Sequence, residues 1–361
     1  MDKITAAGES RTMDKRPLIH GLSKSEIGQI VASLGQPSYR ATQIWEWLYK
    51  RMAFEWNAMS NLPLALREHL DRELAICPGT LTARSADASG SEKLLLTLRD
   101  GECVEQVLIP APGRKTVCVS SQVGCRFKCA FCASGQAGFR RNLEAGEIVA
   151  QTLWAALIWE RRPSNVVFMG IGEPLDNYDN VLKAIRIIND SEGLGIGARK
   201  ITISTSGIIP GMERLAGEGL QIELSVSLHA PTQELRSRLM PVARLYPLDR
   251  LIRACRSYFE KTKRLITFEY VLIRGTNDQA SHARKLAELL SDFPCRVNLL
   301  LLSPVPEFKG TSSSPDAANA FIKTLSRAGI NATLRAPRGL SVNAACGQLR
   351  SSRLCHADTG T

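Results

Sequence analysis

The sequence predicts an α/β protein: a partial (β/α)6 barrel, preceded by a small helical domain and a connecting β-hairpin. From about residue 117 onward, short apolar runs alternate with amphipathic helical segments, a pattern typical of parallel β/α units. Six such units are too few for a closed eightfold barrel, so we expect an open one. Upstream, a capping box at Ser23 and Glu26 predicts a helix, and Asp100-Gly101 predicts a hairpin turn.

The same sequence patterns predict the domain boundaries. We expect a disordered tail at 1–18, a helical domain at 19–75, a hairpin extension at 76–112, the barrel core at 113–350 and a flexible tail at 351–361.

The helical domain should contain a helix from Ser23 to near Gly35 and a second over residues 40–52. The second helix has an apolar stripe of Ala41, Ile44, Trp47 and Leu48. Two interpretations stay open. The domain is a packing module, or it grips RNA through its basic residues and the interleaved aromatic residues Tyr39, Trp45 and Tyr49.

The hairpin should pair residues 93–98 with residues 103–109. A period of two places Glu105 on the same face as Cys103, Val107 and Ile109. Desolvation on an apolar face would raise the pKa of this carboxyl and make it a candidate proton acceptor. The alternative, which periodicity alone favours, is an edge-strand glutamate whose head reaches solvent.

The barrel strands are expected at 117–120, 166–169, 200–204, 221–227, 265–272 and 296–301, and helices at 144–159, 180–189, 248–262, 281–290 and 317–328. Active sites of such barrels gather at the carboxyl ends of the strands. The candidate site residues should therefore follow the strands.

Three cysteines follow the first strand with the spacing Cys125-x3-Cys129-x2-Cys132, here called the cysteine triad. Three thiolates can hold three irons of a 4Fe–4S cluster and leave the fourth iron open to a small-molecule ligand. A structural zinc site is the alternative, but zinc ligands usually come as two pairs, and the nearest downstream histidine is His229. Cys118 and Cys346 also stand in contexts that suggest chemistry.

Polar groups follow the next strands as well. Gly170-Ile171-Gly172-Glu173-Pro174 allows close backbone approach and offers a carboxylate to an ammonium group. Hydroxyls and an imidazole follow at Ser204-Thr205-Ser206 and Ser227-Leu228-His229. Each segment alone could be a helix cap or a turn. Their shared placement at one end of the barrel favours a binding site.

Length, composition and net charge limit the classes of protein to which this chain can belong. The chain has 361 residues, 44% of them apolar, and a formal net charge of +11. No apolar run approaches a membrane span, and the first thirty residues lack the apolar core of a signal peptide. We expect a cytoplasmic protein whose ten cysteines serve metal binding or catalysis, and the charge favours a polyanionic partner.

Taken in order, these residues resemble the radical S-adenosylmethionine (SAM) superfamily, whose cysteine motif usually has an aromatic residue before the third cysteine, as Phe131 is here. Within it, the chain resembles the RlmN/Cfr family of adenosine methyltransferases, closest to RlmN. The segments that carry this resemblance are 39–44, 61–63, 118–124, 138–143 and 344–349. The similarity covers roughly residues 20–350.

The resemblance implies a role for each matching residue. The triad would hold one 4Fe–4S cluster. Cys346 would carry a methyl group as S-methylcysteine, Cys118 would attack its sulfur to resolve the covalent intermediate and leave a disulfide bond, and Glu105 would accept a proton. The residues expected around SAM are Gly172, Glu173, Ser204, Ser227, Leu228, His229 and Ser303. The last departs from the family, which commonly has Asn there.

The implied reaction is formation of 2-methyladenosine in 23S rRNA (adenosine 2503) and tRNA (adenosine 37). It would use two molecules of SAM per turnover and an electron donor such as flavodoxin, in a monomeric enzyme. Three alternatives stay open: Cfr-type methylation at C8 of the same rRNA adenosine, a metal-binding protein without turnover, and a radical enzyme acting on a protein or small metabolite.

Overall fold

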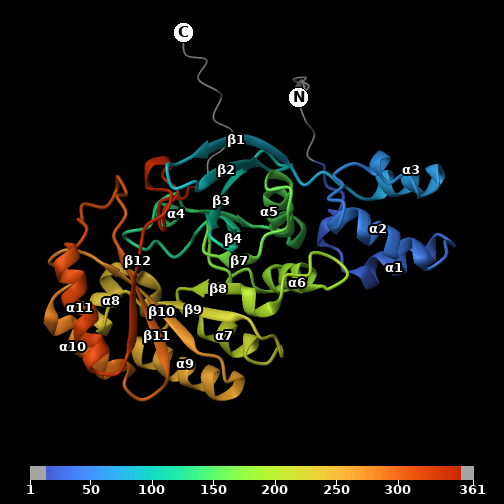
Figure 1. Ribbon diagram of the computed structural model, residues 1–361. Helices are drawn as coiled ribbons and strands as arrows, with labels where there is room; N and C mark the ends of the chain where they lie inside the picture. The colour runs from blue at the N-terminus through green and yellow to red at the C-terminus, as the bar shows by residue number, and fades with distance from the viewer. Residues whose placement is uncertain (1–13, 351–361) are drawn as a thin grey trace, which may run out of the picture.

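The computed structural model describes residues 14–350, so the predicted tail at 351–361 and residues 1–13 lie outside the described residues. A ten-stranded sheet in the order β1-β2-β3-β4-β7-β8-β9-β10-β11-β12 forms the centre of the molecule (Figure 1). Its strands are β1 (Thr80–Ala86), β2 (Glu92–Thr97), β3 (Cys103–Ala111), β4 (Arg114–Cys118), β7 (Asn165–Phe168), β8 (Ile201–Thr205), β9 (Glu223–Ser227), β10 (Ile266–Leu272), β11 (Cys295–Leu301) and β12 (Asn331–Arg335).

Strands β4 and β7 to β12 are all parallel and form the open barrel. The first six of them match the predicted strands, and β12 adds a seventh that was not predicted. Its alternating exposed and half-buried residues carry little of the apolar signal of a core strand. The fold class is confirmed, with one more strand than the six β/α units alone.

Helices follow the parallel strands and cover the outside of the barrel in Figure 1. Their bounds are α5 (Ala145–Ile158), α6 (Tyr178–Asn189), α7 (Ile209–Leu215), α8 (Gln233–Leu239), α9 (Leu248–Thr262), α10 (Ala280–Leu290) and α11 (Pro315–Arg327). Short 3-10 turns lie at η3 (Ala198–Lys200), η4 (Pro241–Arg244) and η5 (Leu340–Val342). Among residues 14–350, no helix is both long and apolar enough to cross a bilayer.

The predicted hairpin is present as β2 and β3, which pair antiparallel. It belongs to a larger antiparallel extension, because β1 pairs with β2 and β3 pairs with β4. The extension therefore continues the barrel sheet, and β3 brings Glu105 to the strand that ends in Cys118.

The helical domain contains α1 (Lys24–Ser33), α2 (Tyr39–Tyr49) and α3 (Leu64–Glu73), with 3-10 turns at η1 (Ile19–Gly21) and η2 (Trp56–Ala58). The capping box at Ser23 and Glu26 is present. Ordered structure begins earlier than predicted, because Leu18 is buried and bridges to Ala75. The predicted disordered tail at 1–18 is thus too long.

The domain packs tightly on the barrel. Gly21 of η1 lies against Gly146 of α5, where a Cβ on Gly21 would come 2.8 Å from the Gly146 nitrogen. Lys183 of α6 pairs with Glu26 at 2.8 Å. Burial also corrects the sequence analysis, because the aromatic rings of Trp45 and Tyr49, expected on an RNA-gripping face, are only 1% and 2% exposed. These two rings cannot stack on bases.

Candidate active site

A cavity of about 470 Å³, here called the main cavity, opens at the carboxyl ends of the parallel strands. Each of the seven strands contributes a lining residue at or near its end: Cys118, Met169, Ser204, Ser227, Val271, Leu301 and Arg335. The predicted site residues that line it are Cys118, Cys125, Cys129, Cys132, Gly172, Glu173, Ser204, Ser227, His229, Ser303 and Cys346. The fold thus brings together residues that are up to 228 positions apart, from Cys118 to Cys346.

The cysteine triad lies between β5 (Gln122–Gly124) and β6 (Phe139–Asn142), followed directly by the short helix α4 (Ala133–Gln136). Gly124 has a φ of +78°, and a Cβ there would collide with the carbonyl oxygen of Gly138. The same oxygen accepts a hydrogen bond from the Cys125 nitrogen at 2.9 Å. Only glycine lets the two ends of the loop close this tightly.

The triad provides a fitting donor set for an iron–sulfur cluster. Burial raises the pKa of Cys125 to about 12 and that of Cys129 well above its usual range, and the neighbouring thiols of the triad raise both further. A cationic centre that binds thiolates would relieve this mutual repulsion. Within residues 14–350 no three His, Cys, Asp or Glu side chains converge as ligands of a single ion. Ligands of a 4Fe–4S cluster need not converge, because each binds a different iron.

A buried cation lies beside the triad. Arg236 of α8 is fully buried and donates through Nη2 to the carbonyl oxygens of Ser206 at 2.7 Å and Ser227 at 3.2 Å. Its Nε and Nη1 have no hydrogen-bond partner among the described residues. Burial lowers the pKa of Arg236 to about 10, although the nearby Cys129 acts in the opposite direction. A buried, incompletely paired cation is costly, so this position suits an anionic group at the triad.

The glycine-rich turn after β7 is held by Gln122. Its side chain accepts from the Glu173 nitrogen at 2.8 Å and donates to Asn142 at 2.9 Å and Asp176 at 2.7 Å. Gly172 has a φ of +101°, and a Cβ there would lie 2.5 Å from the Cβ of Gln122. Backbone conformation and space therefore both require glycine at this position.

Glu173 presents its carboxylate at the cavity wall. One oxygen accepts from the Leu175 nitrogen at 3.1 Å and the other from the Ser206 nitrogen at 2.6 Å. Burial raises the pKa of this carboxyl. A ligand's ammonium group would therefore gain a hydrogen-bonded carboxylate in a poorly solvated site.

His229 follows β9 with a φ of +57°. Its Nδ1 accepts a hydrogen bond from the Val271 nitrogen at 3.0 Å, and Asn277 holds its carbonyl oxygen at 2.8 Å. Burial, followed by the nearby Arg236, lowers the pKa of His229 to about 3. The neutral ring therefore carries its proton on Nε2, which is a fixed hydrogen-bond donor.

Two of the predicted cofactor contacts need separate comment. Leu228 does not line the main cavity: its side chain is fully buried in the core, and its nitrogen donates to the Glu269 oxygen at 3.0 Å. A contact there could use only the backbone. Ser303, just after β11, lines the cavity and is 7% exposed.

The segment that carries Cys346 is tied to the helix after the triad. The nitrogen of Ala133 donates to the Gly347 oxygen at 2.7 Å, and the Ser134 hydroxyl donates to the Leu349 oxygen at 2.7 Å. The Cys346 side chain is exposed to the cavity, while the surrounding walls limit its solvation and raise the pKa of its thiol. The predicted methyl carrier thus lies next to the cysteine triad.

Cys118, at the end of β4, lines the same cavity as Cys346. It packs in one cluster with Val107, Ala344 and Leu349. Val107 lies opposite Cys118 on β3, and Ala344 and Leu349 lie near Cys346 in the sequence. Burial, and next the proximity of Cys346, raise the pKa of Cys118 to about 12. Both cysteines are free thiols. The structure places them close together, whereas the sequence linked them only through the resemblance to a known family.

Glu105 lies close to this cluster but outside the cavity lining. Its side chain is 13% exposed and forms an ion pair with Lys93 at 2.9 Å, and it accepts from the Arg350 nitrogen at 2.8 Å. The expectation of a dry, apolar setting is therefore wrong, and so is that of a solvated edge glutamate. Lys93 on β2 and the chain at Arg350 supply partners that periodicity along β3 could not reveal.

Comparisons with known proteins agree with this geometry. The Radical SAM superfamily model matches residues 119–289, and that of the ribosomal RNA large subunit methyltransferase N-terminal domain matches residues 19–76. A probable dual-specificity RNA methyltransferase RlmN of Geobacillus thermodenitrificans is 46% identical over 338 residues, 93% of each chain. The chain belongs to the RlmN family of radical SAM methyltransferases.

Two further relatives support the assignment to the RlmN family. The protein of the same description from Symbiobacterium thermophilum is 47% identical over 94% of this chain and 92% of its own. The crystal structure of a radical SAM methyltransferase from Sphaerobacter thermophilus superposes with a TM-score of 0.90 and 45% identity, over 92% of this chain and 99% of that one. Radical SAM membership entails a 4Fe–4S cluster and SAM as cofactors.

Sequence reasoning missed several residues that build this RlmN-family site. Gln122 lies within the segment 118–124 that carried the resemblance, so its motif was visible although its role was not. Ser134 and Asn277 act through backbone groups of residues far away in the sequence. Arg236 gave no signal, because an arginine in a helix rich in charge resembles a surface residue.

Proposed function

We propose that the protein is a radical SAM RNA methyltransferase that forms 2-methyladenosine in 23S rRNA (adenosine 2503) and in tRNA (adenosine 37). Its relatives are described as probable dual-specificity RNA methyltransferases, which supports an RNA substrate. The observation that carries the proposal is the pair of free thiols, Cys118 and Cys346, beside the cysteine triad in one cavity. A radical enzyme without a thiol carrier would not need this pair.

The residues present fit the cofactors. Cys125, Cys129 and Cys132 would hold the cluster, which when bound supplies the electron and the open iron site for reductive cleavage of SAM. Glu173 would accept the ammonium group of SAM, and His229 would donate from Nε2. The hydroxyls of Ser204, Ser227 and Ser303, the Gly172 turn and the Leu228 backbone would complete the site.

The two thiols would divide the chemistry. Cys346 opens to the cavity and would accept a methyl group from one SAM, while a second SAM would start the radical step. That step would remove a hydrogen atom from the S-methyl group, whose carbon would then bond to the adenine ring. The ring hydrogen would leave as a proton taken by Glu105, and the remaining electron would pass to the cluster. Cys118, which lines the same cavity, would attack the sulfur of Cys346: an S–S bond would form, the S–C bond to the modified adenine would break, and the leaving carbon would take up a proton.

Glu105 would accept the proton from the adenine ring. Its ion pair with Lys93 at 2.9 Å holds the side chain in place on β3, two residues from Val107 of the cluster that contains Cys118. The hydrogen bond from Arg350 fixes the second oxygen.

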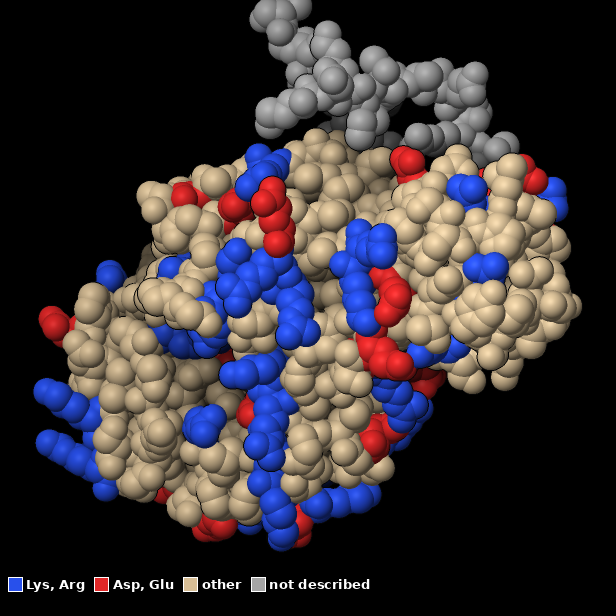
Figure 2. Space-filling view, turned by 45° about the vertical axis from the view of Figure 1, so that its right-hand side comes forward, with Lys and Arg blue, Asp and Glu red and all other residues tan. Residues whose placement is uncertain are grey.

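Surface charge supports an RNA partner. The net charge is +11, and Figure 2 shows Lys and Arg gathered in a band down the middle of one face. In the helical domain, Tyr39 is 53% exposed with the Arg40 guanidinium 4.9 Å from its ring, and Arg51 lies 4.3 Å from the Trp47 ring. Such pairs can stack on bases and contact phosphates. A cytoplasmic monomer with an electron donor such as flavodoxin completes the proposal.

The test is the modified nucleoside. RNA treated anaerobically with reconstituted protein, SAM and reductant is digested and compared by mass spectrometry with 2-methyladenosine and 8-methyladenosine. The proposal expects 2-methyladenosine from the wild type and none from Cys346→Ala. The 8-methyl product would instead establish the Cfr-type alternative, and absence of both would overturn RNA methylation.

A further inference from the structure

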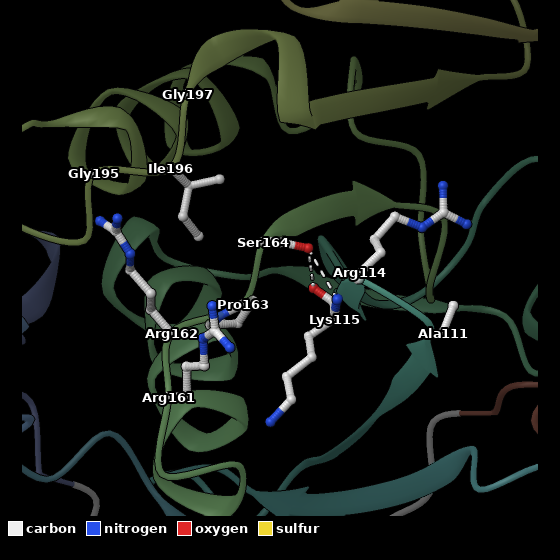
Figure 3. A pocket seen from close by; sticks show the side chains of 11 residues that line it. Ala111, Arg114, Lys115, Arg161, Arg162, Pro163, Ser164, Gly195, Ile196 and Gly197 are labelled. Atoms are coloured by element: carbon white, nitrogen blue, oxygen red, sulfur yellow. Dashed lines mark hydrogen bonds between the residues drawn. The ribbon is translucent and has the colours of Figure 1, made fainter.

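A second cavity, of about 410 Å³, lies at the opposite ends of β4 and β7 from the main cavity. Its lining includes four cationic side chains, Arg114, Lys115, Arg161 and Arg162, together with Ser164. Figure 3 shows these side chains at the rim of the hollow: Arg161, from the segment after α5, extends toward Lys115, while Arg162 extends toward Gly195. We call this cavity the basic pocket.

The cations of the basic pocket lack carboxylate partners. No acidic residue lines the pocket, and among residues 14–350 none of the four cations forms an ion pair with Asp or Glu. Other arginines of the barrel surface are paired, as Arg186 is with Glu218 at 2.7 Å. Four uncompensated charges around one concavity produce a positive potential that attracts an anion.

Two of the four side chains are already held in place. Lys115 lies 5.4 Å from the Trp159 ring centre and donates to the Trp159 oxygen at 3.4 Å. Arg162 donates through Nη1 to the Leu194 oxygen at 3.0 Å, which leaves its other nitrogens available. Preorganised donors lose less conformational entropy when an anion binds.

The basic pocket adjoins the main cavity. Ala111 and Arg114, at the turn between β3 and β4, line both. Arg114 precedes Cys118 by four residues on one strand, a separation of about 13 Å from the rise of an extended chain. An RNA with one base in the main cavity could therefore place a nearby phosphate in the basic pocket.

We propose that the basic pocket binds a backbone phosphate of the RNA, close along the chain to the adenosine in the main cavity. The arginine guanidinium groups match the geometry of a phosphodiester, and Lys115 adds a point charge. Such a contact positions the RNA and does not read its sequence, so one pocket could serve different RNAs. This inference rests on the proposed function for the identity of the polyanion.

The test compares two double variants of the full-length reconstituted protein with equal loss of charge. Arg161→Ser/Arg162→Ser removes two pocket cations, and Arg284→Ser/Lys285→Ser removes two exposed cations of α10 on a different side of the barrel. Affinity for substrate RNA is measured by anisotropy between 50 and 200 mM salt, and methylation of Cys346 by intact mass.

The pocket variant should bind RNA about tenfold more weakly, with a salt slope reduced by about 0.7 for one lost phosphate contact, while Cys346 methylation is unchanged. The α10 variant should match the wild type. Equal salt slopes in all three proteins would overturn the pocket assignment. If the pocket variant shows the reduced slope but the wild type makes no methyladenosine, the proposed function fails while the phosphate site stands.

Discussion

Replacement of Cys118 by alanine should trap RNA on the protein. Outside the cysteine triad, the structure places the Cys118 thiol close to the Cys346 sulfur, and Cys118→Ala removes that thiol. A covalent protein–RNA species should then accumulate to about one equivalent in a single turnover. Cys346→Ala should form none, because it has no methyl carrier.

Because Cys118 is buried, we also expect the release of RNA from the covalent species to depend on pH. A thiol is inactive while protonated, and burial holds the pKa of Cys118 well above its usual range, so only a small fraction is thiolate at pH 8. At any pH below that pKa, each unit of increase in pH raises the thiolate fraction about tenfold. The decay of the wild-type covalent species should therefore accelerate about tenfold per pH unit between pH 7 and pH 9.

The assay is a single turnover with protein methylated beforehand on Cys346, quenched in acid and resolved on a denaturing gel. Cys103→Ala is the matched control, because Cys103 is a buried thiol on β3 outside the cavity lining. It should behave as wild type. Free methylated RNA released by Cys118→Ala at the wild-type rate would refute the two-thiol reasoning.

Three further outcomes follow from the site. Gly172→Ala should lower the free energy of unfolding by about 2 kcal/mol or more, because its Cβ would meet Gln122 and its φ is positive, whereas Gly197→Ala, with open space around its Cβ, should change little in a denaturant titration. Ser303→Ala should weaken anaerobic SAM binding by up to about tenfold if its hydroxyl contacts the cofactor, and calorimetry showing equal affinity would exclude that contact. Arg236→Met should shift the cluster reduction potential to a more negative value, since it removes a buried positive charge; an unchanged potential in an EPR-monitored titration would contradict this.

Much of this barrel could be predicted because its elements follow strong periodic patterns. Helix α9 begins and ends at the residues expected, Leu248 and Thr262, since a wide apolar stripe alternates with charge along its length. Strands β1 and β12 were missed because their residues are mostly exposed or half-buried and carry no apolar run. Edge strands depend on pairing with a neighbour, which one segment of sequence does not show.

The site was predictable where spacing or family motifs carried it and not where it depends on distant contacts. The cysteine triad can be recognised from its spacing alone. The environment of Glu105 was not, because Lys93 and Arg350 reach it across strands and from the far end of the chain. Trp45 was misjudged for a related reason: its burial follows from the domain's packing on Gly193, not from the helix itself.

The tie between α4 and the segment of Cys346 has one more consequence. Ala133 and Ser134 follow Cys132 directly, and their hydrogen bonds to Gly347 and Leu349 leave no flexible spacer between Cys132 and the loop that contains Cys346. A shift of the Cys132 backbone would therefore be transmitted directly to the loop that contains Cys346.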